Sequence, residues 1–381
     1  MGFMNGRMTF ARYLVTGESP LPFGQEHLDR IAEHAIGRHG TGETQDGVSF
    51  GFSGGEHVLD TTFDLAKNVI EDALHVSIRT DTDKIPNSLL RAYTEIELKA
   101  LSADNPTGHP TKAQRAEAKE RAQARAEAEA SDGRFRKLRH DPILWDGREN
   151  ILYVGSTSSA VLERTQVLFR ETFGREIEPI TPGRIAEGNG YSTETGLSLV
   201  GGGNGEEFAA IAWAENLPSS NDVLGNEFLV WLWHTLQADG DTLTLSDGSD
   251  VSVMLAKTLT LDCPRGETGR DHLTDAGPTR LPEALRALQS GKLPRKAGLI
   301  VSRHGMQYDL TLQAESFAVS GANPPKAEGV SGYEAKIARV ETLRHMCETL
   351  DLLFQSFLSR RFSAEWDSEI GRIRRWLEVA A

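Results

Sequence analysis

The chain has 381 residues, a formal net charge of −14, and 39% hydrophobic and 25% charged residues. Such a length suggests about two or three cooperating domains or one elaborated domain, and the composition is ordinary for a folded globular protein. The only dense apolar run, Phe228–Trp233, is far shorter than the ~20 residues of a bilayer span, so we expect no membrane passage. Cys263 and Cys347 lie far apart without a CxxC motif, which fits a reducing cytoplasm and predicts neither a disulfide nor a zinc site.

The first hundred residues alternate between strand and helix signals. Strand formers dominate Met8–Val15, and Leu74–Thr80 alternates like a second strand. Apolar spacing predicts helices over Gln25–Ile36 and Leu89–Leu101. In the second helix we expect four residues to face the core: Leu89, Tyr93, Ile96 and Leu101.

The segment Thr111–His140 is rich in charge and alanine and nearly empty of large apolar residues. It carries nine Lys or Arg against five acids, or +4, so the rest of the chain sums to −18. Its residue types predict a helix over Lys112–Ala130, about 28 Å long at ~1.5 Å per residue. Because its cations lie on opposing faces, we interpret this helix as a solvated arm or helical hairpin.

The residues after this helix have a different character. Four cations alternate with Phe135 and Leu138, and no acid interrupts them before Asp141: Arg134, Arg136, Lys137 and Arg139. Basic residues around an aromatic ring suit a nucleic-acid strand, with cations on phosphate and a ring that stacks on bases. An ordinary edge strand with Phe135 buried is an equally good interpretation.

The middle of the chain reads as an α+β layer. Strands are predicted at Ile143–Asp146 and Ile151–Val154, followed by a helix over Val161–Phe173 and a short strand near Glu176–Ile180. The next segment, Gly188–Ser220, is rich in Gly, Asn and Ser. It lacks the Gly-Lys-Ser/Thr of a phosphate-binding loop, so it is interpreted as a mobile insertion.

The last third continues the α+β pattern. Asn226–Leu236 predicts a buried helix in which Trp231 and Trp233 pack rather than stack on bases. Asp247-Gly248 predicts a hairpin turn, and a further strand follows at Thr258–Leu261. We also expect a helix over Pro282–Gln289, a strand over Gly298–Ser302, and a C-terminal helix with a 3-and-4 apolar repeat from Val340 to Leu358 that docks on its own core.

A second basic cluster lies between these last elements. Lys292, Arg295 and Lys296 follow Gly291 closely, and no acid occurs from Lys292 to Arg303. Such a cluster suits phosphate contact, although a solvated loop is the plainer interpretation.

Four aspartates leave an enzymatic alternative open. Asp60, Asp64, Asp81 and Asp83 are the kind of carboxylates that a two-metal nuclease gathers around Mg²⁺. Spacing alone does not show that they converge, and they equally suit the solvated ends of a strand.

The order of these features resembles the recombination-associated protein RdgC family. The resemblance covers about two thirds of the chain and rests on the early strand, the helix ending near Leu101, the charged arm, the Arg/Phe segment, the Trp145-Asp146 strand and the helix to Phe173. It resumes at Leu285–Val301, where Gln289-Ser290-Gly291-Lys292 and Lys296 look like a helix-Gly-Lys element. The Gly-rich insertion and the long C-terminal helix depart from the shorter family pattern.

The resemblance implies an α+β protein with antiparallel sheets, packed helices and a projecting charged helical arm, which dimerises into a ring. Such a ring would bind duplex DNA without sequence preference, compete with the RecA recombinase for DNA, and need no cofactor, metal or catalytic residue. Single-stranded DNA is left open as a ligand. The resemblance places the protein in the cytoplasm, associated with the nucleoid. Expected DNA-binding residues are Arg134, Phe135, Arg136, Lys137, Arg139, Lys292, Arg295 and Lys296.

The same reasoning divides the chain into six consecutive parts. They are an N-terminal α/β part (1–101), a charged arm (102–140), an α+β layer (141–187), a Gly-rich insertion (188–225), a second α+β part (226–330) and a C-terminal helical segment (331–381). A Mg-dependent nuclease and a protein-interaction scaffold remain the alternative functions.

Overall fold

The computed structural model describes residues 2–38, 47–103, 105, 109–130, 132–191, 217–264, 266, 268–327 and 329–379. Within these ranges the protein is a mixed α+β structure with a 13-stranded sheet and ten α-helices. Its defined strand registers are antiparallel. This confirms the α+β class predicted from the sequence.

The chain packs into two compact units that group segments by contact rather than by order along the chain. Unit 1 contains Met1–Phe23, Val69–His75 and Pro142–Ala381, and unit 2 contains Gly24–Asn68 and Val76–Asp141. The charged segment and the first basic cluster therefore belong to unit 2, whereas the second basic cluster belongs to unit 1.

The sheet of unit 1 joins strands from both ends of the chain. The strand β1 pairs with β13 at Met8↔Ala322 and with β6 at Ala11↔Val154. The strand order from one edge is β10-β9-β11-β12-β13-β1-β6. The strands of this unit are β1 (Met8–Val15), β3 (Val69–Ile70), β6 (Ile151–Val154), β7 (Ile177–Pro179), β8 (Thr242–Thr244), β9 (Asp250–Asp262), β10 (Asp271–Asp275), β11 (Leu293–Arg303), β12 (Met306–Gln313) and β13 (Val319–Asn323).

The strand β9 corrects one sequence prediction. The hairpin at Asp247-Gly248 is confirmed, since β8 and β9 pair around it and Gly248 adopts φ +82°. However, Thr258–Leu261 is not a separate strand but the last part of β9. Lys257 adopts φ +68° near an irregularity in the β9–β11 register, and such a bulge lets one long strand bend without ending.

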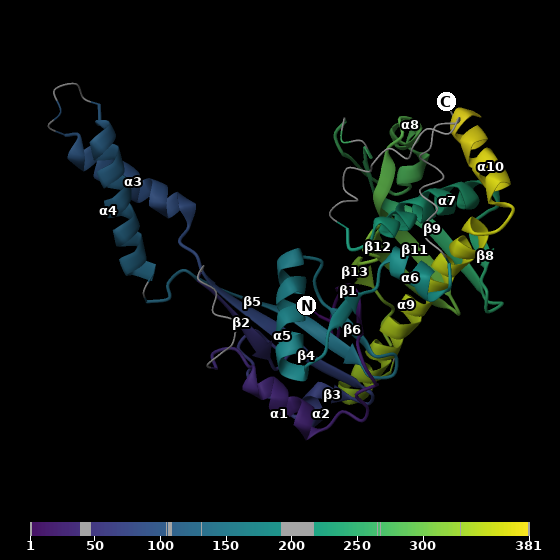
Figure 1. The fold of residues 1–381 in the computed structure, drawn as a ribbon, viewed down its shortest axis with the longest axis horizontal. Helices are drawn as coiled ribbons and strands as arrows, with labels where there is room; N and C mark the ends of the chain where they lie inside the picture. Colours follow the sequence, from purple (N-terminus) through teal and green to yellow (C-terminus); the bar gives the residue numbers. More distant parts are fainter. Residues whose placement is uncertain are drawn as a thin grey trace. The chain divides into compact units, whose positions relative to one another are not determined.

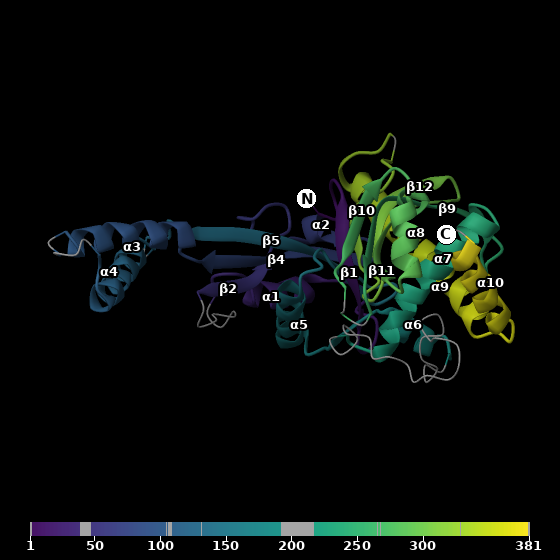
Figure 2. The ribbon, with the colours of Figure 1, turned by 90° about the horizontal axis from the view of Figure 1, so that it is seen from above.

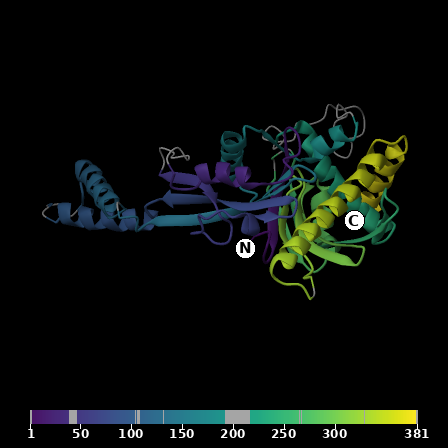
Figure 3. The same ribbon diagram turned by 90° about the horizontal axis from the view of Figure 1, so that it is seen from below.

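Helices α7 and α9 supply much of the core of unit 1. In α7 (Leu224–Ala238) Trp231 and Trp233 are buried, which confirms that they pack in the core. The long helix α9 (Gly332–Arg361) buries Val340 through Leu358 at the predicted spacing within a single chain. It is the yellow-green helix that crosses the green strands in Figure 3. Phe228 of α7 meets Phe354 of α9 edge to face, with ring centroids 5.4 Å apart, so the predicted docking on its own core is confirmed.

The other helices of unit 1 are no longer than α7. They are α5 (Ser159–Phe173), α6 (Pro182–Gly188), α8 (Pro282–Gln289) and α10 (Trp366–Val379). The Gly-rich insertion predicted between α6 and α7 lies mainly outside the described residues. No helix in the described ranges is long and apolar enough to cross a membrane.

Unit 2 is built on β2 (Val48–Ser53) paired with β4 (Ala73–Asp83), whose first residues lie in unit 1. The helix α1 covers Gln25–Glu33 and ends before the predicted Ile36, and α2 covers Leu65–Asn68. The helix stops because the N–H of Ile36 donates to the carbonyl of Phe52, and Phe52 donates back to His34. A tertiary contact with β2 therefore overrides the helical periodicity of this segment.

A helical hairpin connects β4 to β5 (Arg136–Asp146), the next strand in the sheet. It consists of α3 (Asn87–Leu101) and α4 (Lys112–Ala130), and lies beyond the ends of β4 and β5 (Figures 1 and 2). Ala118, Ala122 and Ala126, one every fourth residue, are at most 1% exposed. Because residues four apart share a helix face, these alanines form a seam without bulky side chains, and α3 can pack closely on α4.

The hairpin confirms the predicted helix Lys112–Ala130 and corrects the predicted face of α3. Tyr93 is buried, but Ile96, which was expected to face a core, is 54% exposed. The reason is that α3 packs on the narrow alanine seam of α4 rather than on a broad core. Leu89 and Leu90 pack partly buried beside Tyr93, and Leu101 is also half-buried.

Candidate nucleic-acid interface

The first basic cluster leads from the hairpin into the sheet. We call Arg134–Arg139 the basic strand segment; β5 begins within it, at Arg136. Residues 136–139 are exposed, whereas the strand is buried from Asp141 onward. Because side chains alternate along a strand, Lys137 and Arg139 lie on one face, and Arg136 and Leu138 on the other. The segment therefore presents cations on both faces.

Acids that are distant in sequence or lie outside the basic run approach three of the four cations. Arg134 lies 3.3 Å from Asp132, Arg136 lies 3.1 Å from Asp83 of β4, and Arg139 lies 2.7 Å from Asp141. Lys137 is exposed and has no ion pair among the described residues. The positive charge of the acid-free run is thus partly neutralised by acids that precede it, follow it or lie on the neighbouring strand β4.

The arginines of these ion pairs are open to solvent. The arginine side chains are 60%, 51% and 59% exposed for Arg134, Arg136 and Arg139. Hydrogen bonds to Asp83 raise the pKa of Arg136. The acids that pair with Arg134 and Arg136 are also exposed, and exposed pairs contribute only about 0–1 kcal/mol, so a phosphate could replace Asp132 or Asp83 at little cost. The partner of Arg139 differs, because Asp141 is buried.

The apolar residues of the segment are only partly covered. Phe135 is half-buried, and Leu138 is 38% exposed. Neither interpretation of Phe135, as a stacking ring or as a buried edge residue, is favoured by this intermediate burial. Most of the segment lies in a strand, as the alternative predicts, but that strand is not at an edge, because β5 lies between β6 and β4 in the sheet.

The second basic cluster differs because most of its charge is neutralised inside unit 1. Lys292 is only 9% exposed and its Nζ lies 2.8 Å from Asp271, while Arg295 lies 2.6 Å from Glu315. Lys296 is exposed and carries no ion pair among the described residues. The cluster is also not a loop, because β11 begins at Leu293.

Arg303, at the end of that acid-free run, has a structural role. It is 3% exposed and pairs with Asp247 and Glu348. Sequence reasoning missed these partners because Asp247, Asp271, Glu315 and Glu348 lie between 20 and 56 residues from the cations that they pair with. Within the second cluster, Lys296 is the residue best placed to meet a phosphate.

The cations of α4 fall into the two groups that helical spacing separates, and these groups differ in their ion pairs. Arg121 pairs with Glu117 at 2.6 Å, and Arg125 lies 3.7 Å from Glu129 and 4.2 Å above the Tyr93 ring. A second group has no ion pair among the described residues: Lys112, Arg115 and Lys119 on α4, and Arg91 on α3. Arg91 was not singled out from the sequence, because nothing in its local pattern marks it as unpaired.

The four aspartates of the nuclease alternative have separate partners. Lys67 pairs with Asp60 at 2.9 Å, and Arg79 pairs with Asp81 at 2.7 Å. Asp83 pairs with Arg136, and Asp64 accepts a hydrogen bond from the N–H of Ala66 at the start of α2. Burial tends to raise the pKa of Asp60, but hydrogen bonds from Lys67, Thr62 and Glu56 lower it overall. Nowhere in the described ranges do three or more His, Cys, Asp or Glu side chains group as metal ligands would.

A cavity of about 540 Å³ beside α9 also contains arginines, but these are internally compensated. Arg12 is 4% exposed and forms two hydrogen bonds with Asp351, of 2.7 and 2.6 Å. Arg344 similarly binds Asp146 and Asp72. Burial raises the pKa of the neighbouring Cys347 thiol to about 12. Arg148, the third arginine of the described lining, pairs with Asp72 and Glu341. The arginines of the described lining are therefore all engaged by acids.

Comparison with known proteins does not add a functional assignment. No protein-family model matches the chain, and no curated protein matches it either. The basic strand segment and the unpaired cations of the hairpin, both in unit 2, are therefore the candidate interface on structural grounds alone.

Proposed function

We propose that the protein binds DNA without sequence preference through the basic strand segment of unit 2. The observation that supports this most is Lys137, an exposed cation without an ion pair in the described residues, flanked by three arginines whose side chains are exposed. Contacts of this kind neutralise phosphates and release counterions, which gives affinity without reading bases. Lys296 of unit 1 is a further candidate contact.

The proposal extends to a homodimeric ring around duplex DNA. It rests on the resemblance to the RdgC family and on the charge distribution, because an acidic exterior with a basic lumen would reconcile a net charge of −14 with DNA affinity. In this proposal the α3–α4 hairpin is the charged arm that positions or closes the assembly. Occupying duplex DNA would limit the access of the RecA recombinase, in the cytoplasm at the nucleoid.

Binding of a random duplex as a function of salt tests the proposal. The parent protein should bind, and each phosphate contact should contribute about −0.9 to the slope of log K against log salt. Lys137→Glu should weaken binding and reduce the magnitude of the slope by about 0.9 or more. The control Lys326→Glu makes the same charge change at an exposed lysine of unit 1. A slope near zero, or equal effects of both variants, would overturn the proposal.

The two alternatives predict other outcomes in the same assays. A protein-interaction scaffold predicts that charge reversal at Arg134, Arg136 and Lys137 leaves DNA binding unchanged. A nuclease predicts that supercoiled DNA is cut in Mg²⁺ or Mn²⁺, whereas a binder retards it uncut.

A further inference from the structure

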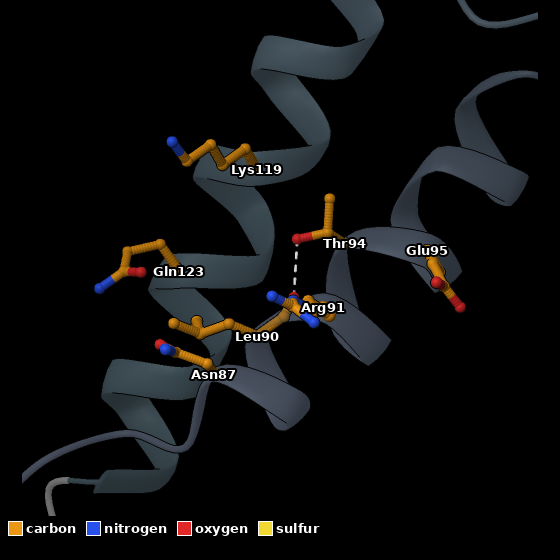
Figure 4. A pocket seen from close by; sticks show the side chains of 7 residues that line it. All are labelled: Asn87, Leu90, Arg91, Thr94, Glu95, Lys119 and Gln123. Carbon is orange, nitrogen blue, oxygen red and sulfur yellow. Dashed lines mark hydrogen bonds between the residues drawn. The ribbon is translucent and has the colours of Figure 1, made fainter. Parts of the chain in front are cut away.

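The hairpin of unit 2 has a groove that the proposed function does not use. It has a volume of about 430 Å³ and is lined by residues of both helices, which Figure 4 shows from close by. The lining residues are Asn87, Leu90, Arg91, Thr94, Glu95, Lys119 and Gln123. Arg91 and Lys119 are the two cations of the groove.

The two cations are available to a ligand. Arg91 and Lys119 are exposed and have no ion pair among the described residues. The single acid of the lining, Glu95, points away from Lys119 and Gln123 in Figure 4. The local charge of the groove near α4 is therefore positive, although the hairpin as a whole contains nearly as many acids as bases.

The neutral polar groups of the groove are also of the kind that bind phosphate. Asn87 and Gln123 are exposed, and their amides can donate hydrogen bonds; Gln123 already donates one N–H to Glu127 at 2.7 Å, which leaves its second N–H. Thr94 already donates its hydroxyl to the carbonyl of Leu90 at 2.7 Å, so it adds no donor. Lys, Arg, Asn and Gln are among the side chains that contact phosphates in protein–DNA complexes.

A row of cations on α4 leads into the groove. Its spacing favours a nucleic-acid strand over an acidic peptide as the partner. Lys112, Arg115 and Lys119 lie on one helix face, and the first two, like Lys119, have no ion pair in the described residues. Their span of seven residues is about 10 Å at ~1.5 Å per residue. Phosphates of one strand repeat about every 3.4 Å along a duplex axis, so the row covers about three of them. A regular row of cations fits this regular polyanion better than an acidic peptide.

We infer that the α3–α4 groove is a second phosphate-binding site, which holds the sugar-phosphate backbone of a nucleic-acid strand between Arg91 and Lys119. This inference rests on the proposed function and deepens it, because it adds a contact surface on the hairpin to that of the basic strand segment. The two surfaces belong to the same unit but use different residues.

The test compares two double substitutions that remove equal charge from the same hairpin. In R91Q/K119Q both groove cations are lost. In the control R121Q/R125Q, two cations are lost from α4 that already have acidic partners and do not line the groove. With a random duplex, the slope of log K against log salt should fall in magnitude by about 1.8 for the first variant, at ~0.9 per phosphate, and by clearly less for the control. Circular dichroism checks that both variants keep their helices.

A second measurement locates the contact directly. Acylation of lysines by an amine-reactive reagent should be slower at Lys119 when duplex DNA is bound, and unchanged at Lys99, an exposed lysine of α3 outside the groove. If the parent binds DNA but Lys119 is not protected and R91Q/K119Q matches its control, the groove inference is wrong while DNA binding by the basic strand segment stands. If the parent binds no DNA, both proposals fail. Protection of Lys119 by an acidic peptide but not by DNA would also overturn the inference.

Discussion

A buried ion pair joins two helices of unit 1. Glu227 of α7 is fully buried, and its Oε2 accepts a hydrogen bond of 2.8 Å from Arg361 of α9, which is 6% exposed. Each charge would be costly to bury alone, so the pair depends on both partners being present. Sequence places these residues on two apolar helices but does not reveal that they meet.

Removing one partner should therefore be far worse than removing both. We expect Arg361→Met to lower the free energy of unfolding by about 3–5 kcal/mol, because the buried charge of Glu227 loses its hydrogen bond from Arg361. Adding Glu227→Leu should restore a substantial part of this loss. Arg360→Met, at the exposed neighbouring residue that pairs with Glu365, serves as control and should cost about 1 kcal/mol or less. Urea unfolding of the four proteins measures these differences, and equal losses for the single and double variants would contradict the argument.

Asp247, at the turn between β8 and β9, should make the free energy of unfolding depend on pH in the acidic range. Hydrogen bonds from the hydroxyl and the N–H of Ser249, together with Arg303, lower its pKa to about 2. An aspartate in the unfolded chain has a pKa of about 3.9. Because the folded pKa is the lower one, the contribution to stability is complete above about pH 4 and is lost as the pH falls toward about 2.

The variant Asp247→Asn tests this sign. It should be less stable than the parent at neutral pH, and the difference should shrink as the pH falls from about 4 to about 2. Urea midpoints at a series of pH values measure it. A difference that stays constant through this range would show that Asp247 does not keep its charge in the folded state to unusually low pH.

At the scale of elements, composition predicts the bounds of helix α4, whereas tertiary packing determines which helix it contacts. Helix α4 begins and ends where the sequence predicts, because Ala, Glu, Lys, Arg and Gln all favour helix strongly. Its partner could not be predicted, because the seam of Ala118, Ala122 and Ala126 carries almost no hydrophobic signal. Tyr93 completes the contact, donating a hydrogen bond of 2.7 Å to Glu129 while its ring lies under Arg125.

The alanine seam should not tolerate larger side chains. We expect Ala122→Leu to destabilise the hairpin by about 1–3 kcal/mol, because α3 and α4 must separate to make room. Ala124→Leu adds the same atoms at an exposed residue of α4 and should be near neutral. Hydrogen exchange of the α4 amides is the suitable measurement, since a hairpin can open without global unfolding. Equal protection in the two variants would argue against close packing at the seam.

At the scale of the whole molecule, a net charge of −14 and DNA binding are compatible only if the cations are concentrated locally. The basic strand segment offers four per chain, namely Arg134, Arg136, Lys137 and Arg139. If all four contact phosphates, the salt slope should be about −4 for a monomer and about −7 for a dimer, at ~0.9 per contact. Native mass and salt-dependent binding measured on the same sample check both quantities together. A dimer whose slope is about −2 or smaller in magnitude would show that the segment is not the main contact.

The candidate site was only partly predictable from the sequence. The pattern around Phe135 singled out the basic strand segment, because an uninterrupted run of cations is a local feature. The same reasoning overvalued Lys292 and Arg295, whose acidic partners Asp271 and Glu315 come from other strands and turns. It also missed Arg91, which matters only because α3 packs beside Lys119 of α4.

The sequence by itself determined the α+β class, the position of most strands and helices, and the burial of the C-terminal apolar repeat. These follow from short-range periodicity and intrinsic propensity, which act within a few residues. Only the tertiary structure decided where α1 stops, which face of α3 is covered, and which cations remain unpaired. The reason is that hydrogen bonds and ion pairs between distant segments, such as Ile36 with Phe52 or Arg136 with Asp83, leave no mark in the local pattern.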